Sequence, residues 1–237
     1  MTDRIYFRQL LAGRDFALAN PVAEQMANFV YLIGDLQTRE CVMVDPAWDV
    51  SSLLDLAALD QMKPIGALVT HYHPDHVGGS LFGYNIAGVA NLMERVPVKV
   101  HVNKEEADGL KVITGLSEND LVRHESGDSL EIGSLKITFI HTPGHTPGSQ
   151  CFLVDQRLVS GDTLFINGCG RVDLPGSDPV QMYESLTGKL AKLPDDVALY
   201  PGHNYADRPA STIGQEKQSN YCLRVPTLDK WLSLMGR

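Results

Sequence analysis

The chain has 237 residues, of which 43% are hydrophobic and 21% are charged, a balance that excludes a wholly disordered or collagen-like protein and predicts a single domain spanning residues 1–237. A net charge of −9 argues against nucleic acid as a partner, because binding to phosphate backbones depends largely on Lys and Arg. No stretch approaches the ~20 apolar residues of a membrane span, residues 1–7 lack the features of a secretory signal, and the four cysteines have no CxxC spacing. We therefore expect a cytoplasmic protein with no membrane partner.

The first predicted elements are two strands and a helix. Residues 29–34 and 41–45 are β-branched or aromatic runs separated by a polar stretch, which predicts an antiparallel pair. Residues 49–59 carry apolar side chains at helical spacing, with Ser51 and Ser52 as candidate N-caps. The chain thus begins with a mixture of strands and helices.

The later elements repeat this mixture. The patterns predict a strand at 98–102 with a polar helix after it, hairpins around 132–134 and 155–156, an amphipathic helix at 178–193, a strand at 198–200 and a helical tail from Ser211. Two similar halves, each with strands and helices, predict an α+β fold in which two sheets pack face to face and helices cover their outer faces.

A dense group of potential metal ligands follows a predicted buried strand at 65–70. Four imidazole or carboxylate side chains lie within six residues: His71, His73, Asp75 and His76. In an extended segment, residues two apart point the same way, so the first two can bind one ion. The other two follow the turn at Pro74 and can face a neighbouring ion.

Three later segments each end a predicted strand and present one further ligand beside a glycine. They are the His145 turn (TPGHTPG), the Asp162 turn (SGDT) and the His203 turn (YPGHN). Glycine allows the backbone to turn tightly near an ion. Together with the histidine group, these segments complete a set of ligands for two metal ions.

The ordered motifs HxHxDH, lone His, SGDT and PGH resemble the ligand signature of the metallo-β-lactamase superfamily, from about Gln25 to His203. The resemblance implies an αββα four-layer sandwich. It also implies a first metal site at His71, His73 and His145, a second at Asp75, His76 and His203, and Asp162 as a ligand shared by both.

The resemblance implies metal-dependent hydrolysis. A hydroxide bridging two divalent ions would be the nucleophile, and Asp75 would help to orient it as a catalytic residue. Zinc is the expected metal, although the same ligands accept iron and manganese. The sequence contains no GxSxG motif that would supply a serine nucleophile instead.

Residues 162–178 and 211–216 resemble stretches shared by glyoxalase II-like hydrolases and persulfide dioxygenases. Only 34 residues follow His203, so we expect the helical domain of longer glyoxalase II enzymes to be absent and the compact type to be the closer match. The 74 positions from His71 to His145 favour the hydrolases. We expect a thioesterase acting on a small-molecule substrate such as an acyl-glutathione. The alternatives are hydrolysis of a lactone or another ester, and a persulfide dioxygenase with one iron at His71, His145 and Asp162.

Arg171 and Tyr205 are the candidate substrate-binding residues, because both follow ligand-bearing turns and could meet the substrate at the mouth of the site. An ion pair with Asp173 or Asp178 that shapes the loop is an equal alternative for Arg171. The intact ligand set argues against a module that has the fold without the activity. Whether the protein forms a homo-oligomer is left open.

Further pocket candidates are Met26, Phe29 and Tyr84, for which burial in the core is at least as good an explanation. His101 and His124 lack a flanking motif. We expect these two histidines to be structural or exposed rather than ligands.

Overall fold

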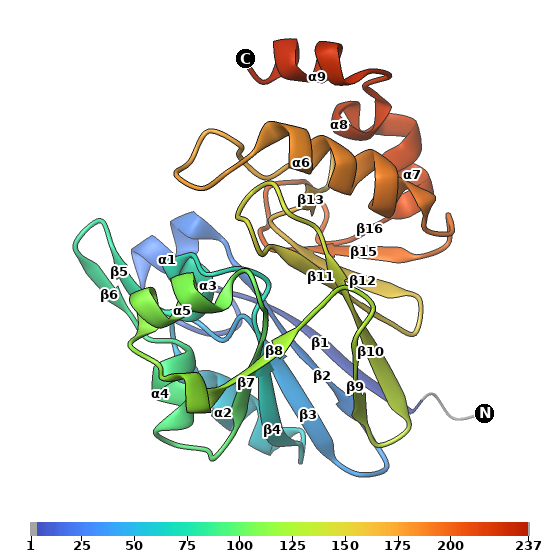
Figure 1. Cartoon of the computed structure of the whole chain (residues 1–237). Coiled ribbons are helices and arrows are strands. Elements are labelled where there is room, and N and C mark those ends of the chain that lie inside the picture. Colours follow the sequence, from blue (N-terminus) through green and yellow to red (C-terminus); the bar gives the residue numbers. More distant parts are fainter. Residues whose placement is uncertain (1–3, 237) are drawn as a thin grey trace.

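Two six-stranded β-sheets form the centre of the protein in the computed structural model, which describes residues 4–236 (Figure 1). The first sheet has the order β1 (Ile5–Leu11), β2 (Phe29–Asp35), β3 (Glu40–Val44), β4 (Lys63–Leu68), β7 (Lys99–Asn103) and β8 (Leu121–His124). The second has the order β16 (Ser211–Thr212), β15 (Ala198–Pro201), β12 (Arg157–Gly161), β11 (Gln150–Val154), β10 (Leu135–His141) and β9 (Ser129–Ile132).

The two sheets bury one shared core, because side chains alternate between the two faces of each strand. In β2, Phe29, Tyr31 and Ile33 join a buried cluster to which both sheets contribute, whereas Val30 and Leu32 pack with the helices on the outer face. β11 in the second sheet repeats this alternation. The strands are therefore apolar on both faces, as expected for sheets covered on both sides.

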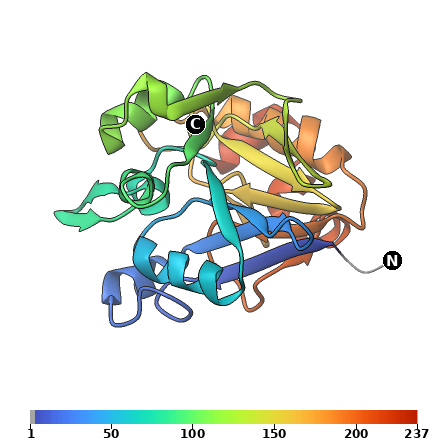
Figure 2. The ribbon, with the colours of Figure 1, turned by 90° about the horizontal axis from the view of Figure 1, so that it is seen from below.

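Helices cover the outer face of each sheet (Figures 1 and 2). The first sheet is covered by α1 (Pro21–Met26), α2 (Val50–Leu59), α4 (Val89–Met93) and α5 (Ala107–Thr114). The second is covered by α6 (Pro179–Tyr183), η2 (Glu184–Lys189), η3 (Leu190–Lys192), α7 (Ile213–Ser219) and α8 (Tyr221–Arg224), and α9 (Leu228–Leu234) packs against α6. The predicted α+β sandwich with four layers is confirmed.

Several predicted elements are confirmed and three details differ. The β2–β3 pair and the hairpins β9–β10 and β11–β12 are antiparallel as predicted. The N-cap of α2 is Asp49 and not Ser51 or Ser52, because the helix already begins at Val50 and the Asp49 carboxylate accepts the Ser52 backbone N–H at 3.0 Å. The amphipathic stretch 178–193 is helical but divides into α6, the π-helical η2 and η3. Strands β1, β8 and β16 have no counterpart among the predicted elements.

Short elements complete the edge where the predicted ligands lie: α3 (Pro74–Val77), the hairpin of β5 (Gly79–Leu81) and β6 (Tyr84–Ile86), and the hairpin of β13 (Leu164–Phe165) and β14 (Gly168–Cys169). The 3-10 turn η1 (Glu118–Asp120) precedes β8. Within residues 4–236, no helix is long and apolar enough to cross a lipid bilayer.

Hydrogen bonds join the two sheets at this edge. The backbone N–H of Phe29 in the first sheet donates to the Gly202 carbonyl at 2.8 Å, and the N–H of Gln150 in the second donates to the Thr70 carbonyl at 2.9 Å. These bonds hold the loop after β15 against β2 and the loop after β4 against β11, and both loops carry predicted ligands.

Candidate metal centre

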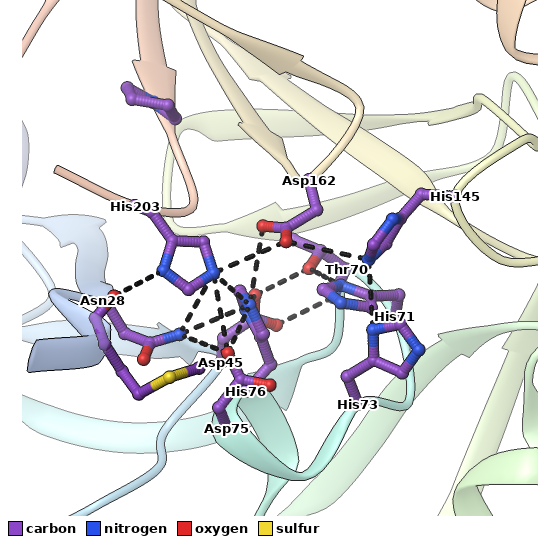
Figure 3. Close-up of polar contacts among 12 residues, drawn as sticks. Asn28, Asp45, Thr70, His71, His73, Asp75, His76, His145, Asp162 and His203 are labelled. Atoms are coloured by element: carbon purple, nitrogen blue, oxygen red, sulfur yellow. Dashed lines mark hydrogen bonds and ion pairs between the residues drawn. The ribbon is translucent and has the colours of Figure 1, made fainter. Parts of the chain in front are cut away.

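The first predicted ligand group is assembled from two loops. His71 and His73 follow β4, and His145 follows β10. One ring nitrogen from each lies within 4.8 Å of the other two, and His145 Nε2 is 3.0 Å from His73 Nδ1 (Figure 3). The structure thus brings together the three histidines that the sequence assigns to one ion.

The second predicted group combines the short helix α3 with the loop after β15. Asp75 and His76 lie on α3, and the side chains of both, together with His203, place one ligand atom each within 4.8 Å of one another. His76 Nε2 is 3.1 Å from His203 Nε2, and Asp75 Oδ2 is 3.4 Å from His203 Nε2.

Asp162 lies between the two groups. Its Oδ2 is 3.6 Å from His145 Nε2 of the first group and 3.4 Å from His203 Nε2 of the second. The neighbouring turns are close enough to require glycine: a Cβ at Gly202 would lie 2.4 Å from Asp162 Oδ1. The glycine beside the ligand therefore leaves the space that the carboxylate occupies.

In two of the histidine rings, Nδ1 points away from the centre and forms a hydrogen bond with a backbone carbonyl outside the ligand groups. His145 Nδ1 is 2.9 Å from the Arg171 carbonyl, and His203 Nδ1 is 2.8 Å from the Met26 carbonyl. A carbonyl only accepts, so each of these Nδ1 atoms carries the hydrogen. In the neutral ring, Nε2 then carries no hydrogen, and its lone pair is directed into the centre, as is common for metal-bound histidine.

Asp45 orients a ring in each group. Its Oδ2 accepts the Thr70 hydroxyl at 2.6 Å and lies 2.9 Å from His76 Nδ1. The Thr70 oxygen, having donated its only hydrogen, accepts from His71 Nδ1 at 3.0 Å. His71 Nε2 consequently carries a lone pair and no hydrogen, and this atom is buried without any hydrogen-bond partner.

These contacts fit a site for cations. A buried acceptor without a partner costs roughly 1–3 kcal/mol, and both His71 Nε2 and Asp162 Oδ1 are in this condition. The facing Nε2 atoms of His76 and His203, 3.1 Å apart, also need a proton or a cation between them. Imidazole and carboxylate are the ligands that zinc and other divalent transition metals accept.

The charge distribution supports the same interpretation. Burial by itself would raise the pKa of Asp75 and Asp162, but the surrounding histidine rings lower it well below the usual range. Burial lowers the pKa of His73 to about 4 and that of His71 well below its usual value. Carboxylates are therefore ionised and these two rings neutral at pH 7, which are the states that ligate metal.

Three buried polar residues that contact the predicted ligands were not among the predicted site residues: Asp45, Asn28 and Thr70. Asp45 has the same signal as the predicted ligands, since it is the first polar residue after an apolar strand, and its backbone has φ +51°. Asn28 donates from Nδ2 to Asp75 Oδ2 at 2.9 Å. Thr70 directly precedes the histidine group, so its position was visible in the sequence although its role was not.

Glu106 joins the two loops of the first group. Oε1 of this buried carboxylate accepts the Tyr72 backbone N–H at 2.7 Å and the Thr146 hydroxyl at 2.8 Å, and Oε2 accepts the Gly148 N–H at 2.7 Å. Burial raises the pKa of Glu106 to about 7. No motif marks this residue, because its partners lie 34 to 42 positions away in sequence.

A pocket of about 420 Å³ opens onto both groups. Arg171 and Tyr205 line it, as does Met26, and the Tyr205 ring stacks on His203 with centroids 4.7 Å apart. Arg171 also forms the alternative ion pair, with Nε 2.9 Å from Asp173 Oδ1. A role for Arg171 and Tyr205 in substrate binding stays a prediction.

For Phe29 the alternative, burial in the core, is confirmed, because its strand position directs it between the sheets. Both explanations given for Tyr84 were wrong, since it is on an exposed face of β6, outside the pocket lining. His101 and His124 lie outside the ligand groups found among residues 4–236. They pair with each other at 2.8 Å, and His124 stacks on Phe139.

Comparisons with known proteins agree with this geometry. A model of the metallo-beta-lactamase superfamily matches residues 24–203. The chain is 39% identical to the hydroxyacylglutathione hydrolase of Yersinia pestis over 85% of this chain and 76% of that protein. It is 30% identical to the mitochondrial persulfide dioxygenase ETHE1 of Homo sapiens over 88% of this chain and 76% of that protein. The crystal structure of ETHE1 from Myxococcus xanthus superimposes with a TM-score of 0.80 at 28% identity, covering 98% of this chain and 90% of that one.

Proposed function

The chain belongs to the metallo-β-lactamase superfamily, and from this premise we propose that it is a hydrolase of thioesters, such as an acyl-glutathione, with a centre for two divalent metal ions. One observation carries the proposal: two groups of three ligand side chains lie side by side, with Asp162 between them. In each group, outer hydrogen bonds hold rings in the orientation that ligation needs.

The proposed ligands are those of the two groups. His71, His73 and His145 would hold one ion, Asp75, His76 and His203 would hold the other, and Asp162, which lies between the two groups, would be a ligand to both. Zinc is the metal we propose, since its preferred ligands are imidazole and carboxylate in sites that keep a position open for water or substrate.

When bound, divalent ions lower the pKa of a coordinated water and polarise a carbonyl group. The chain's own part is to bind and orient the reactants. Asp75 lines the pocket, and Asn28 fixes its Oδ2, so the carboxylate is placed to orient the attacking water. In the reaction the water oxygen bonds to the acyl carbon, the C–S bond breaks, and the thiol leaves with a proton.

Persulfide oxidation is the second candidate, because the human relative is a persulfide dioxygenase. A facial triad for one iron would be His71, His145 and Asp162. The second ligand group favours hydrolysis. One iron would not need this group, yet its side chains are buried and both of its histidines form hydrogen bonds with residues outside it.

The test compares two reactions of the purified protein. We expect hydrolysis of S-lactoylglutathione, followed through loss of the thioester, and no oxygen uptake with glutathione persulfide. Oxygen uptake with the persulfide and no thioester hydrolysis would overturn the proposal. Hydrolysis of lactones or oxygen esters alone would also overturn the thioester assignment.

A further inference from the structure

The pocket has an apolar wall beside its ligand-bearing floor. Apart from the predicted ligands, the side chains lining it include Met26, Leu81, Phe82, Phe165, Leu174 and Pro175. Arg171 is the single lysine or arginine among the described residues that line the pocket, and its guanidinium lies on the Asp173 carboxylate. The wall therefore suits an apolar group far better than a charged one.

Phe82 is placed in this wall by an unusual turn. The strands β5 and β6 pair with Leu81 opposite Tyr84, so Phe82 and Gly83 alone form the loop, and both have positive φ, +49° and +83°. This two-residue turn with positive φ at both positions strongly prefers Asn-Gly or Asp-Gly. A bulky aromatic residue at the first position is a backbone outlier.

Phe82 is also 88% exposed, and its hairpin projects from the body of the protein (Figures 1 and 2). The residue thus combines backbone strain with an apolar ring in water, and neither stabilises the fold. Backbone strain of this kind is often found at active sites and ligand-binding positions. Its position at the pocket offers the reason, because a bound apolar group would cover the ring.

We propose that Phe82 is a specificity-determining residue that holds the apolar acyl group of the substrate, so that the protein prefers thioesters with longer apolar acyl chains to those with short or polar ones. This inference rests on the proposed thioesterase activity and names its substrate class. Each methylene that is fully buried on binding contributes up to about fourfold in affinity.

The experiment measures kcat/KM for a series of acyl-glutathiones with acetyl, butanoyl, hexanoyl and octanoyl groups, all sharing one thiol. The wild type should show at least a tenfold rise from acetyl to hexanoyl. Phe82→Asn, which introduces the residue that the turn prefers, should reduce the hexanoyl-to-acetyl ratio at least fivefold while the unfolding midpoint stays the same or rises. Tyr84→Ala is the matched control on the same hairpin, and it should leave the ratio unchanged.

The outcomes separate this inference from the activity on which it rests. A wild type that hydrolyses the series without a chain-length preference would overturn the role of Phe82 and leave the thioesterase proposal intact. The same holds if Phe82→Asn keeps the wild-type ratio, or if it lowers the unfolding midpoint and the rates for all substrates alike, because Phe82 would then be structural. A wild type that hydrolyses none of the thioesters would overturn both proposals.

Discussion

The floor of the pocket, formed by the seven predicted ligands, and its rim, formed by Phe82, Arg171 and Tyr205, differ in how firmly they are held. On the floor, His71, His145 and His203 are at most 3% exposed, and hydrogen bonds with Thr70, the Arg171 carbonyl and the Met26 carbonyl fix the three rings. On the rim, Tyr205 is 61% exposed and Phe82 88%. On the proposed function, the chemistry would therefore be built into the sandwich, whereas substrate selection would depend on exposed loops.

The largest effect is expected on the floor, from Asp162→Ala. Because Asp162 contacts both ligand groups, its removal should lower the metal content of both and reduce hydrolysis by more than about 100-fold, beyond what loss of an outer partner costs. Elemental analysis and initial rates measure this. His124→Ala is the control, since His124 lies outside the ligand groups, and it should keep its metal. An Asp162→Ala protein with full metal content would show that Asp162 is not a shared ligand.

Asp45→Asn tests whether the outer hydrogen bonds matter for the floor. The amide replaces a carboxylate oxygen that serves Thr70 and His76, so both ligand groups lose a fixed ring. We expect metal affinity to fall about 10- to 100-fold, measured by competition with a chelator. Asp49→Asn, four positions along the chain at the N-cap of α2, should bind metal as the wild type does. Equal affinities in all three proteins would contradict the role given to Asp45.

Glu106→Gln tests how the free energy of unfolding depends on pH through the carboxyl group that joins two loops of the floor. Burial raises the pKa of Glu106 from 4.5 to about 7, so between these values the folded protein retains a proton that the unfolded chain has released. Its contribution to stability is therefore present below pH 4.5 and is lost as pH rises to about 7, by about 3 kcal/mol in all. Subtracting the free energy of unfolding of the variant from that of the wild type at each pH isolates this change. A difference that is constant from pH 4.5 to 7 would contradict it.

The smallest effect is expected on the rim, from Arg171→Ala. We predict unchanged metal content, a similar unfolding midpoint and a rate on acyl-glutathione reduced about three- to tenfold, if Arg171 contacts the substrate. Asp173→Ala separates the two explanations for Arg171. The same loss in both variants would show that the ion pair shapes the loop, and that Arg171 does not act on the substrate directly.

The floor could be predicted from the sequence far better than its supports. The seven predicted ligands follow strands and lie beside glycine or within one short motif, so local spacing is enough to predict them. Asp45 and Glu106 act on residues 25 to 42 positions away, and such pairings arise only when the loops meet in three dimensions. Most sheet strands were predictable from continuous apolar runs, whereas β1 was not, because Arg8 and Gln9 interrupt its apolar run.

The rim could not be predicted for a different reason. Phe82 follows the histidine group in a stretch without clear periodicity, and an aromatic residue before glycine predicts no particular turn. Its importance appears only when the positive φ, the exposure and the pocket are seen together. Exposed loops carry weaker sequence signals than core strands, because no packing pattern constrains them.

The number of metal ions per chain is the most direct test of the central claim that this floor holds two ions for hydrolysis. Elemental analysis of the purified protein, with protein concentration determined independently, should give close to two divalent ions per chain, with zinc as the expected metal. A single iron per chain, retained after dialysis while the site at Asp75, His76 and His203 stays empty, would contradict the account.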